Sequence, residues 1–519
     1  MIKVLESRFS LIFLIPFLLG LISVFGFQPF NFSIVNFIIF PALFFIFTYV
    51  NKKSKSIYRK KPHLKYLFLI GYFFGVGFFL SGTYWITNAL TFDPSFQKLI
   101  PFVFALIPLT LGIFFGLMSI IFAGHLRNNF GSVLLFSLML SVNDFFRSKV
   151  LTGFPWNLWA YSLSWFDEFL QILNPIGLFS FNLIVITLFS IPAVFFFNNK
   201  KNSVFTLLFS IIIAISIYFY GSYKVNTNQI SINKSDNEKS INFKIVSPSF
   251  NIQYNLDDEQ VQSQLKDLIK YSDPDKSKKT IFVWPEGVFA GYSFFELKKF
   301  KNSIDQNFSE KHIIIFGVNT LDQKSGNFFN SLVAINNKFE ILYTYNKKKL
   351  VPFGEFLPFE DKLKLFGLKK VTEGFGSFLR GRDQKNFIFE NYNILPLICY
   401  EIIFTDFVQK SDHKTNLIIN LSEDGWFGKS IGPYQHLSKA KFRAIENNTF
   451  VIRTANRGFS AFINNRGEII KSLNPSESGN IEMKVPVLTN NNKNKNDLIF
   501  LILLITYIVT FFVLRKFKI

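Results

Sequence analysis

A carboxylate, an amine and a thiol each stand just past the end of a short apolar run that is typical of a buried strand. Glu286 follows the run 280–284, Lys347 the run 341–345 and Cys399 the run 394–398. Strand ends face the ligand crevice in layered α/β sheets, so these side chains are expected to meet there. Such a set suits acyl transfer, because the carboxylate takes the thiol proton, the thiolate attacks a carbonyl and the ammonium stabilises the oxyanion.

Each of these residues also has an ordinary structural interpretation. A single cysteine is more often a small core hydrophobe than a nucleophile. Glu286 follows a proline and fits a helix cap, and Lys347 opens a run of three lysines of the kind that is usually solvated. Taken singly, the residue types do not decide between a structural and a catalytic role.

The elements around these positions predict one layered α/β domain over 242–485. Amphipathic helices are expected at 257–271 and 434–447, and the polar stretches 222–241 and 486–497 are expected linkers. The predicted strands are 243–246, 280–284, 313–318, 331–335, 341–345, 394–398, 417–421, 450–454, 459–463 and 468–473.

The chain as a whole is too apolar for an ordinary soluble protein of this size. Of the 519 residues, 49% are hydrophobic and 18% are aromatic. A span needs about 20 mostly apolar residues, which predicts a transmembrane domain over 1–221 and a last span with a basic tail over 498–519. The candidate spans lie at 8–27, 30–50, 65–89, 98–124, 131–146, 172–197, 203–221 and 498–514.

Positive residues predict the orientation, because they stay on the cytoplasmic side of short loops. They fall in alternate loops, so 222–497 is expected on the extracytoplasmic face. Arg147 and Lys149 are exceptions on the outer side, where they are expected to meet lipid phosphates. The net charge of +21 is therefore assigned to orientation rather than to nucleic acid. The clusters comprise Lys52, Lys53, Lys55, Arg59, Lys60, Lys61, Lys65, Arg127, Lys200, Lys201, Arg515, Lys516 and Lys518.

The counts of cysteine and histidine restrict the chemistry further. One cysteine allows no intrachain disulfide. The five histidines form neither HExxH nor a cluster with cysteine at zinc-ligand spacing. We predict no metal and no cofactor.

Several stretches resemble the apolipoprotein N-acyltransferases, the membrane-embedded branch of the carbon-nitrogen hydrolase (nitrilase) superfamily. The resemblance implies a membrane α-helical bundle of about eight spans plus an extracytoplasmic α/β nitrilase-like αββα sandwich domain. It also implies the bacterial inner membrane, with the catalytic domain on the periplasmic side. The matching stretches are FGFQPF at 25–30, GVGFFLSGTYWI at 75–86, LTGFPWNLWAYS at 151–162, WPEG at 284–287, YNKKKLVPFGEFLPFE at 345–360, ICYE at 398–401 and the run 420–461 that begins NLSEDGWFG.

By position, the resemblance implies Glu286 as general base, Lys347 as oxyanion stabiliser and Cys399 as nucleophile. Lys347 is chosen over the two lysines that follow it because the family lysine lies eight residues before the glutamate of the FGE motif. The implied supporting residues are Glu355, Tyr400 and Glu401, and the Tyr400 backbone N–H is expected to complete the oxyanion hole.

The sequence departs from the family pattern at one place. Members have a lysine-tryptophan pair shortly after a first-strand glutamine, whereas here Gln253 is followed by Tyr254. What replaces the tryptophan stays open, with Tyr254 as one possibility.

The implied reaction moves a fatty acyl chain from phospholipid, by resemblance phosphatidylethanolamine, through a cysteine thioester to the α-amine of the diacylglyceryl-cysteine of apolipoproteins. The expected enzyme is a monomer that binds no nucleic acid. A membrane-tethered carbon-nitrogen hydrolase with the same three residues and a non-enzymatic lipoprotein-binding scaffold are the alternatives. Segment 351–378 is either a hydrophobic lid or a surface loop, and the aromatic segments 81–85 and 153–161 are either an interfacial belt or a lipid vestibule.

Overall fold

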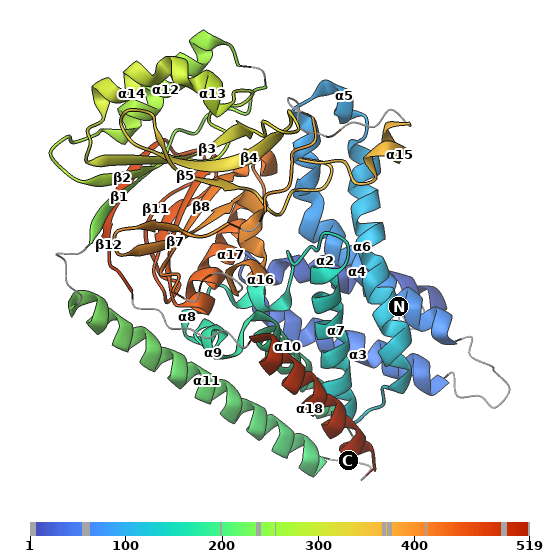
Figure 1. Cartoon of the computed structure of the whole chain (residues 1–519). Helices are drawn as coiled ribbons and strands as arrows, with labels where there is room; N and C mark the ends of the chain where they lie inside the picture. The colour runs from blue at the N-terminus through green and yellow to red at the C-terminus, as the bar shows by residue number, and fades with distance from the viewer. Residues whose placement is uncertain are drawn as a thin grey trace. The chain divides into compact units, whose positions relative to one another are not determined.

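The structure is a computed structural model and the chain forms two compact units, shown in Figure 1. The membrane unit comprises Met1–Thr87, Lys98–Val225 and Lys495–Ile519, and the sheet unit comprises Asn88–Gln97 and Asn226–Asn494. The described residues are 7–53, 63–197, 200–234, 240–254, 256–365, 370, 376–382, 384–409, 412, 414–488 and 496–516.

The membrane unit is built from apolar helices, as predicted. Within the described ranges, 7 helices are long and apolar enough to cross a membrane, and they match 7 of the predicted spans. The remaining prediction, 8–27, corresponds to the shorter apolar stretch Ser10–Gly26. The chain is therefore a multi-pass membrane protein. The main helices are α2 (Ile15–Ile22), α3 (Asn36–Lys53), α4 (His63–Thr83), α6 (Ile100–Phe122), α7 (Phe130–Lys149), α10 (Leu178–Ser190), α11 (Lys200–Lys234) and α18 (Asn496–Lys516).

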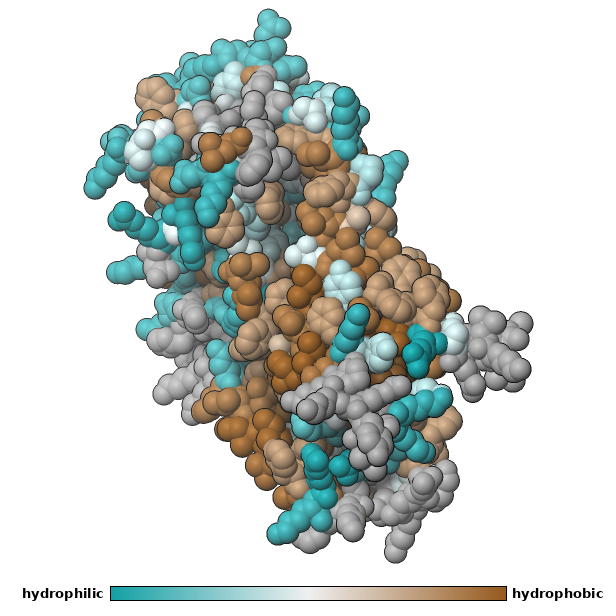
Figure 2. Space-filling view, turned by 90° about the vertical axis from the view of Figure 1, so that its right-hand side faces the viewer, coloured by the Kyte–Doolittle hydropathy of each residue, from teal (hydrophilic) through white to brown (hydrophobic). Residues whose placement is uncertain are grey.

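Large hydrophobic side chains lie on the outside of this unit. On α6, Phe102 is 63% exposed and Ile121 is 55% exposed. Figure 2 shows hydrophobic residues, in brown, gathered in one broad area of the face that it presents. A contiguous apolar surface of this kind suits lipid rather than water.

The structure corrects the expectation for Arg147. Its guanidinium forms an ion pair with Asp144 at 3.1 Å, and both side chains are fully buried. Asp144 also accepts a hydrogen bond from Asn182 Nδ2 at 2.9 Å. Arg147 therefore balances a buried carboxylate inside the bundle rather than binding lipid phosphates, and α7 turns its polar residues inward.

The tryptophans of the two aromatic segments are buried within the membrane unit. Trp85 and Trp156 contact each other with ring centroids 4.6 Å apart, and Trp159 stacks on Phe78 at 4.6 Å. All three tryptophans are less than 5% exposed. They pack in the interior of the bundle and do not form an exposed interfacial belt.

Helix α11 is longer than the predicted span. It continues to Lys234 and includes most of the expected linker 222–241. The extension contains no proline and no glycine after Gly221, so nothing in the sequence ends the helix there.

The sheet unit contains two six-stranded sheets (Figure 1). The first has the order β12-β1-β2-β3-β4-β5 and the second β11-β10-β9-β8-β7-β6. The strands are β1 (Ile241–Ser247), β2 (Thr280–Val283), β3 (His312–Leu321), β4 (Phe328–Ile335), β5 (Ile341–Asn346), β6 (Phe387–Phe389), β7 (Tyr392–Ile398), β8 (Leu417–Glu423), β9 (Phe450–Asn456), β10 (Ser460–Ile463), β11 (Ile469–Leu473) and β12 (Gly479–Val485).

Two apolar cores hold the layers of this unit together. One contains residues of both sheets, such as Phe243 and Ile394, and therefore lies between them. The other joins the first sheet to α12 (Asp258–Ser272), α13 (Phe294–Leu297) and α14 (Lys301–Asn307). Helix α17 (Gly432–Asn447) contacts β9 of the second sheet. The predicted αββα sandwich is confirmed.

Each predicted strand and both predicted helices are present, but two strands were missed. β6 has only three residues. β12 pairs antiparallel with β1 at the edge of its sheet, and most of its residues are partly exposed. An edge strand of this kind lacks the continuous apolar run by which the buried strands are recognised.

A segment between two apolar helices belongs to the sheet unit. Residues 88–97 follow α4 and precede α6, yet they cluster with the sheets. Asn88 Nδ2 donates to the Phe427 carbonyl at 2.6 Å, and the rings of Phe92 and Trp426 lie 5.3 Å apart. These contacts fix the segment beside the turn that follows β8.

Candidate active site

Strand ends place the three predicted reactive residues. β2 runs parallel to β3, and the antiparallel pairs β3–β4 and β4–β5 bring β5 into the same direction. Glu286 follows β2 and Lys347 directly follows β5, so both stand at one end of the first sheet. Cys399 directly follows β7 of the second sheet. The site therefore combines residues from two sheets that face each other.

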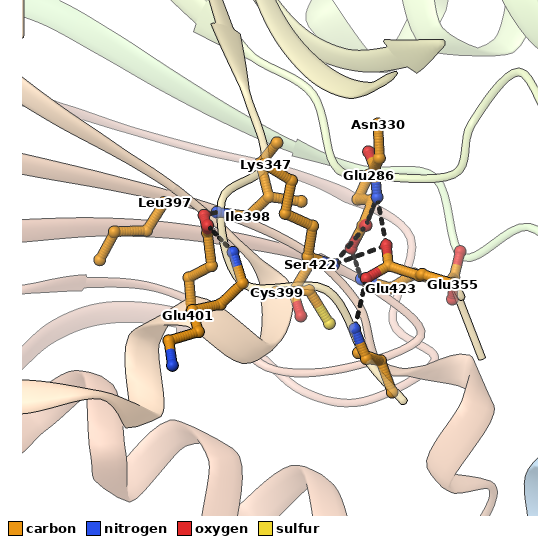
Figure 3. Close-up of polar contacts among 12 residues, drawn as sticks. Glu286, Asn330, Lys347, Glu355, Leu397, Ile398, Cys399, Glu401, Ser422 and Glu423 are labelled. Carbon is orange, nitrogen blue, oxygen red and sulfur yellow. Dashed lines mark hydrogen bonds and ion pairs between the residues drawn. The ribbon is translucent and has the colours of Figure 1, made fainter. Parts of the chain in front are cut away.

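Lys347 lies at the centre of this site. Its ammonium is 2.9 Å from Glu355 Oε1 and 3.5 Å from Glu286 Oε1, and its side chain is 1% exposed. Burial alone would lower the pKa of the Lys347 ammonium, but the charges of Glu286 and Glu355 outweigh burial and raise that pKa above its usual value. Lys347 is therefore a permanent cation at neutral pH. Figure 3 shows its side chain directed toward Glu286 and Cys399.

Asn330 of β4 joins the two glutamates. Its Nδ2 donates to Glu286 Oε1 at 2.8 Å and to Glu355 Oε1 at 2.7 Å. The other oxygen of Glu286 accepts from the backbone N–H of Glu423 at 3.2 Å. Gly317 lies behind Glu286, where a Cβ would come within 2.9 Å of the Glu286 Cα. The Glu286 carboxylate therefore has three partners, namely Asn330, Lys347 and the Glu423 N–H. The backbone of Glu286 lies so close to β3 that position 317 has room only for glycine.

Cys399 occupies a sharp turn between β7 and a short helical turn. Its φ of 49° is in the left-handed region, and the residue is 8% exposed. Burial raises the pKa of the Cys399 thiol, the charge of Glu286 raises it further, and the Lys347 ammonium offsets part of that increase. The cysteine therefore rests as a thiol and needs a base at the moment of attack.

Glu401 connects the ends of β5 and β7. Its fully buried carboxylate accepts hydrogen bonds from the Tyr345 hydroxyl at 3.0 Å and from the backbone N–H groups of Ile398, Lys348 and Lys349 at 2.9, 2.7 and 3.0 Å. Burial raises the pKa of Glu401, and the backbone donors act against that increase. Glu401 therefore connects the two strand ends that carry the amine and the thiol, and its supporting role in catalysis stays a prediction.

The two lysines that follow Lys347, and Tyr400, contact aromatic rings. The amines of Lys348 and Lys349 lie over the rings of Phe407 and Phe404, at 5.8 and 4.8 Å, so Lys347 is the lysine that meets the glutamates. The half-buried ring of Tyr400 packs edge-on against Phe404. The oxyanion role expected for the Tyr400 backbone N–H stays a prediction.

Two residues of the site were missed by the sequence analysis. Asn330 lies beside Ser331 in β4, whose other residues are apolar, and Glu423 is the last residue of β8. Glu423 is 5% exposed and accepts from Asn456 Nδ2 at 2.7 Å and from the Gly425 N–H at 2.9 Å. Burial raises the pKa of the Glu423 carboxyl well above its usual value. The available signal was the acidic pair at positions 423 and 424, shortly after the predicted strand 417–421.

The predictions for segment 351–378 and for Tyr254 are not tested by the described residues. In segment 351–378, residues 366–369 and 371–375 lie outside the described residues, whereas Phe359 is 76% exposed. The lid therefore stays a prediction. The ring of Tyr254 lies 6.0 Å from that of Trp426, and its role in place of the family tryptophan also stays a prediction.

Two family profiles match different parts of the chain. A family profile described as the apolipoprotein N-acyltransferase N-terminal domain matches residues 19–191, and one described as carbon-nitrogen hydrolase matches residues 249–489. A solved structure from Saccharomyces cerevisiae, a member of branch 10 of the nitrilase superfamily, is 17% identical with a TM-score of 0.36. It covers 48% of this chain and 90% of its own.

Curated relatives match over nearly the full chain. The apolipoprotein N-acyltransferase of Rickettsia typhi is 31% identical over 91% of this chain and 92% of its own length. That of Rickettsia prowazekii is 32% identical over the same shares, and that of Allorhizobium ampelinum is 29% identical over 83% of each chain. With this identity across both the membrane unit and the sheet unit, the chain belongs to the apolipoprotein N-acyltransferase family.

Proposed function

We propose that this protein is an apolipoprotein N-acyltransferase in which Cys399 carries the acyl chain from a phospholipid to the α-amine of a diacylglyceryl-cysteine. The observation that carries the proposal is that Cys399, the only cysteine, lies near a buried Lys347 that contacts both Glu286 and Glu355. This arrangement supplies a nucleophile, a base and a permanent cation in one place.

In the first step, Glu286 removes the thiol proton and Sγ attacks the ester carbonyl of the phospholipid. The sulfur–carbon bond forms and the ester carbon–oxygen bond breaks. The proton then passes from Glu286 to the departing lysophospholipid oxygen. The Lys347 ammonium and the Tyr400 backbone N–H are the proposed donors to the oxyanion.

In the second step, the α-amine of the apolipoprotein attacks the thioester. The nitrogen–carbon bond forms, the carbon–sulfur bond breaks, and Glu286 transfers the amine proton to the leaving sulfur. The thiol is thereby restored. Because the Cys399 pKa is raised by burial, its return to the protonated state is favourable and completes the cycle.

The membrane helices anchor the enzyme in the bilayer that contains both of its proposed substrates. Donor and acceptor are both lipid-anchored, so an enzyme held in the same bilayer raises their effective concentration. We propose phosphatidylethanolamine as the donor and a monomer as the working unit.

The segment 88–97 supports a periplasmic site. It connects two predicted spans and packs on the sheet unit through the Asn88–Phe427 hydrogen bond. The loop and the sheets therefore share one side of the membrane. The alternation of positive loops assigns that side to the periplasm in a bacterial inner membrane.

The test uses the full chain in nanodiscs that contain phosphatidylethanolamine with a labelled acyl chain, together with a diacylglyceryl peptide. We expect one acyl mass on Cys399 without the peptide and label on the peptide α-amine when it is added. Cys399→Ala should abolish both signals. Label released only as free fatty acid would favour the hydrolase, and acylation of lipoproteins by Cys399→Ala in a depleted strain would favour the scaffold.

A further inference from the structure

Asn420 lies on β8, directly beside the strand that ends in the nucleophile. Its Nδ2 donates to the Leu397 carbonyl at 3.2 Å and to the Cys399 carbonyl at 3.5 Å. Leu397 is its cross-strand partner in the parallel β7–β8 pair. The amide group therefore bridges the last regular part of β7 and the turn that carries the thiol.

A buried network fixes the orientation of this amide. The Arg453 guanidinium donates to Asn420 Oδ1 and also to Asp424 Oδ2 at 2.7 Å. Asp424 in turn lies 2.9 Å from His436 Nδ1. These four side chains are fully buried. Because a guanidinium only donates, the oxygen of Asn420 must face it, and the two amide hydrogens must face the carbonyls.

The backbone that Asn420 contacts is strained. Cys399 has a φ of 49°, and a left-handed conformation is unfavourable for a residue with a Cβ. Such a conformation persists only where the surrounding structure imposes it. The hydrogen bond from Asn420 to the Cys399 carbonyl, supported from behind by Arg453, is a contact of this kind.

We propose that Asn420, oriented by Arg453, is a positioning residue that holds Cys399 in the left-handed conformation and so aims its thiol into the site. The inference rests on the proposed function for its natural reaction. The geometry applies equally to any simple acyl donor that reaches the sulfur.

The test therefore uses a donor that is independent of lipids. The full-length protein in detergent is mixed with p-nitrophenyl butyrate, from which Sγ displaces p-nitrophenolate while the thiol proton passes to the general base. Cys399 is the only cysteine, so a butyryl thioester can form on no other residue, and Cys399→Ala gives the background of butyryl mass and p-nitrophenolate. Asn420→Asp keeps one oxygen as the partner of Arg453 but replaces the donating Nδ2 with a second oxygen, which faces the two carbonyls.

For Asn420→Asp we expect the maximal acylation rate to fall by about 100-fold, with the half-saturating ester concentration unchanged. A matched control is Asn416→Asp, just before the first residue of β8. Asn416 is 8% exposed and its Nδ2 donates to the Asn391 carbonyl at 2.9 Å. This control should stay within about threefold of wild type.

Equal losses in the two variants, or wild-type acylation by Asn420→Asp, would overturn the inference. If Asn420→Asp does not fold, Arg453→Lys replaces it, because lysine keeps the charge beside Asp424 but lacks the planar fork that also holds Asn420. Arg453→Lys should slow acylation with an unchanged half-saturating concentration, and a wild-type rate would count against the proposal. Acylation of the wild type by the ester but never by phospholipid would instead contradict the proposed function. The effect of Asn420→Asp on acylation by the ester would still test the positioning role.

Discussion

The Lys347 ammonium lies 2.9 Å from Glu355 Oε1, and the two side chains are 1% and 9% exposed. Every described partner of the Glu355 carboxylate is a donor. Oε1 accepts from Lys347 and from Asn330, and Oε2 accepts from the Val351 N–H at 2.8 Å. The loop that carries Glu355 is therefore connected to the reactive centre through charge as well as hydrogen bonding.

Glu355→Gln is expected to be disruptive although it is nearly isosteric. One end of the glutamine amide must donate, so it faces another donor, and the Lys347 cation loses a counter-charge. We expect acylation of Cys399 to fall at least about tenfold and the free energy of unfolding to fall by about 1–3 kcal/mol. Intact mass and thermal unfolding measure these effects. Glu340→Gln, at an exposed carboxylate that accepts from Asn336, is the control, and equal behaviour of the two variants would contradict the argument.

Asn330→Asp is expected to damage the same site by charge repulsion. It would set a third carboxylate against Glu286 and Glu355, where a buried amide now donates to both at 2.7–2.8 Å. We expect at least about a tenfold loss of thioester formation. Asn336→Asp makes the same change beside the exposed Glu340 and should act like wild type. Preserved activity in Asn330→Asp would show that the bridge is dispensable.

The protonation of Cys399 predicts the pH dependence of its alkylation. A raised pKa means that the thiol keeps its proton to higher pH than an ordinary cysteine, so the thiolate fraction is smaller at any given pH. The rate of iodoacetamide addition, followed by intact mass, should be below that of free N-acetylcysteine at pH 8 and should still be rising at pH 9. A plateau below pH 8 would indicate a standing thiolate instead.

The buried ion pair of α7 predicts a difference between single and double substitutions. Arg147→Met leaves Asp144 buried without its counter-charge, which costs about 3–5 kcal/mol. Asp144→Asn combined with Arg147→Met removes both charges and should be milder. Thermal unfolding in detergent compares the two variants. A double variant less stable than Arg147→Met alone would show that Asp144 does not depend on Arg147.

Local patterns in the amino-acid sequence predicted the helices and strands and indicated the candidate reactive residues. Apolar runs predicted the membrane helices and the buried strands, because their periodicity and length reflect the environment of each residue directly. Glu286, Lys347 and Cys399 were identified because each follows such a run within a matching motif. The spacing of Asp144 and Arg147, three residues apart on one helix, also contained the signal for their ion pair.

The contacts between residues far apart in the chain depend on how the strands and loops pack. The reactive centre combines the ends of β2 and β5 from one sheet with the end of β7 from the other, and no local pattern specifies that pairing. Asn330 and Asn420 likewise lie in mostly apolar strands, and the strand pattern does not show which groups they contact. Their partners are supplied by neighbouring strands and loops across the fold, and a buried polar group acquires its role only from the partners that burial brings within hydrogen-bonding distance.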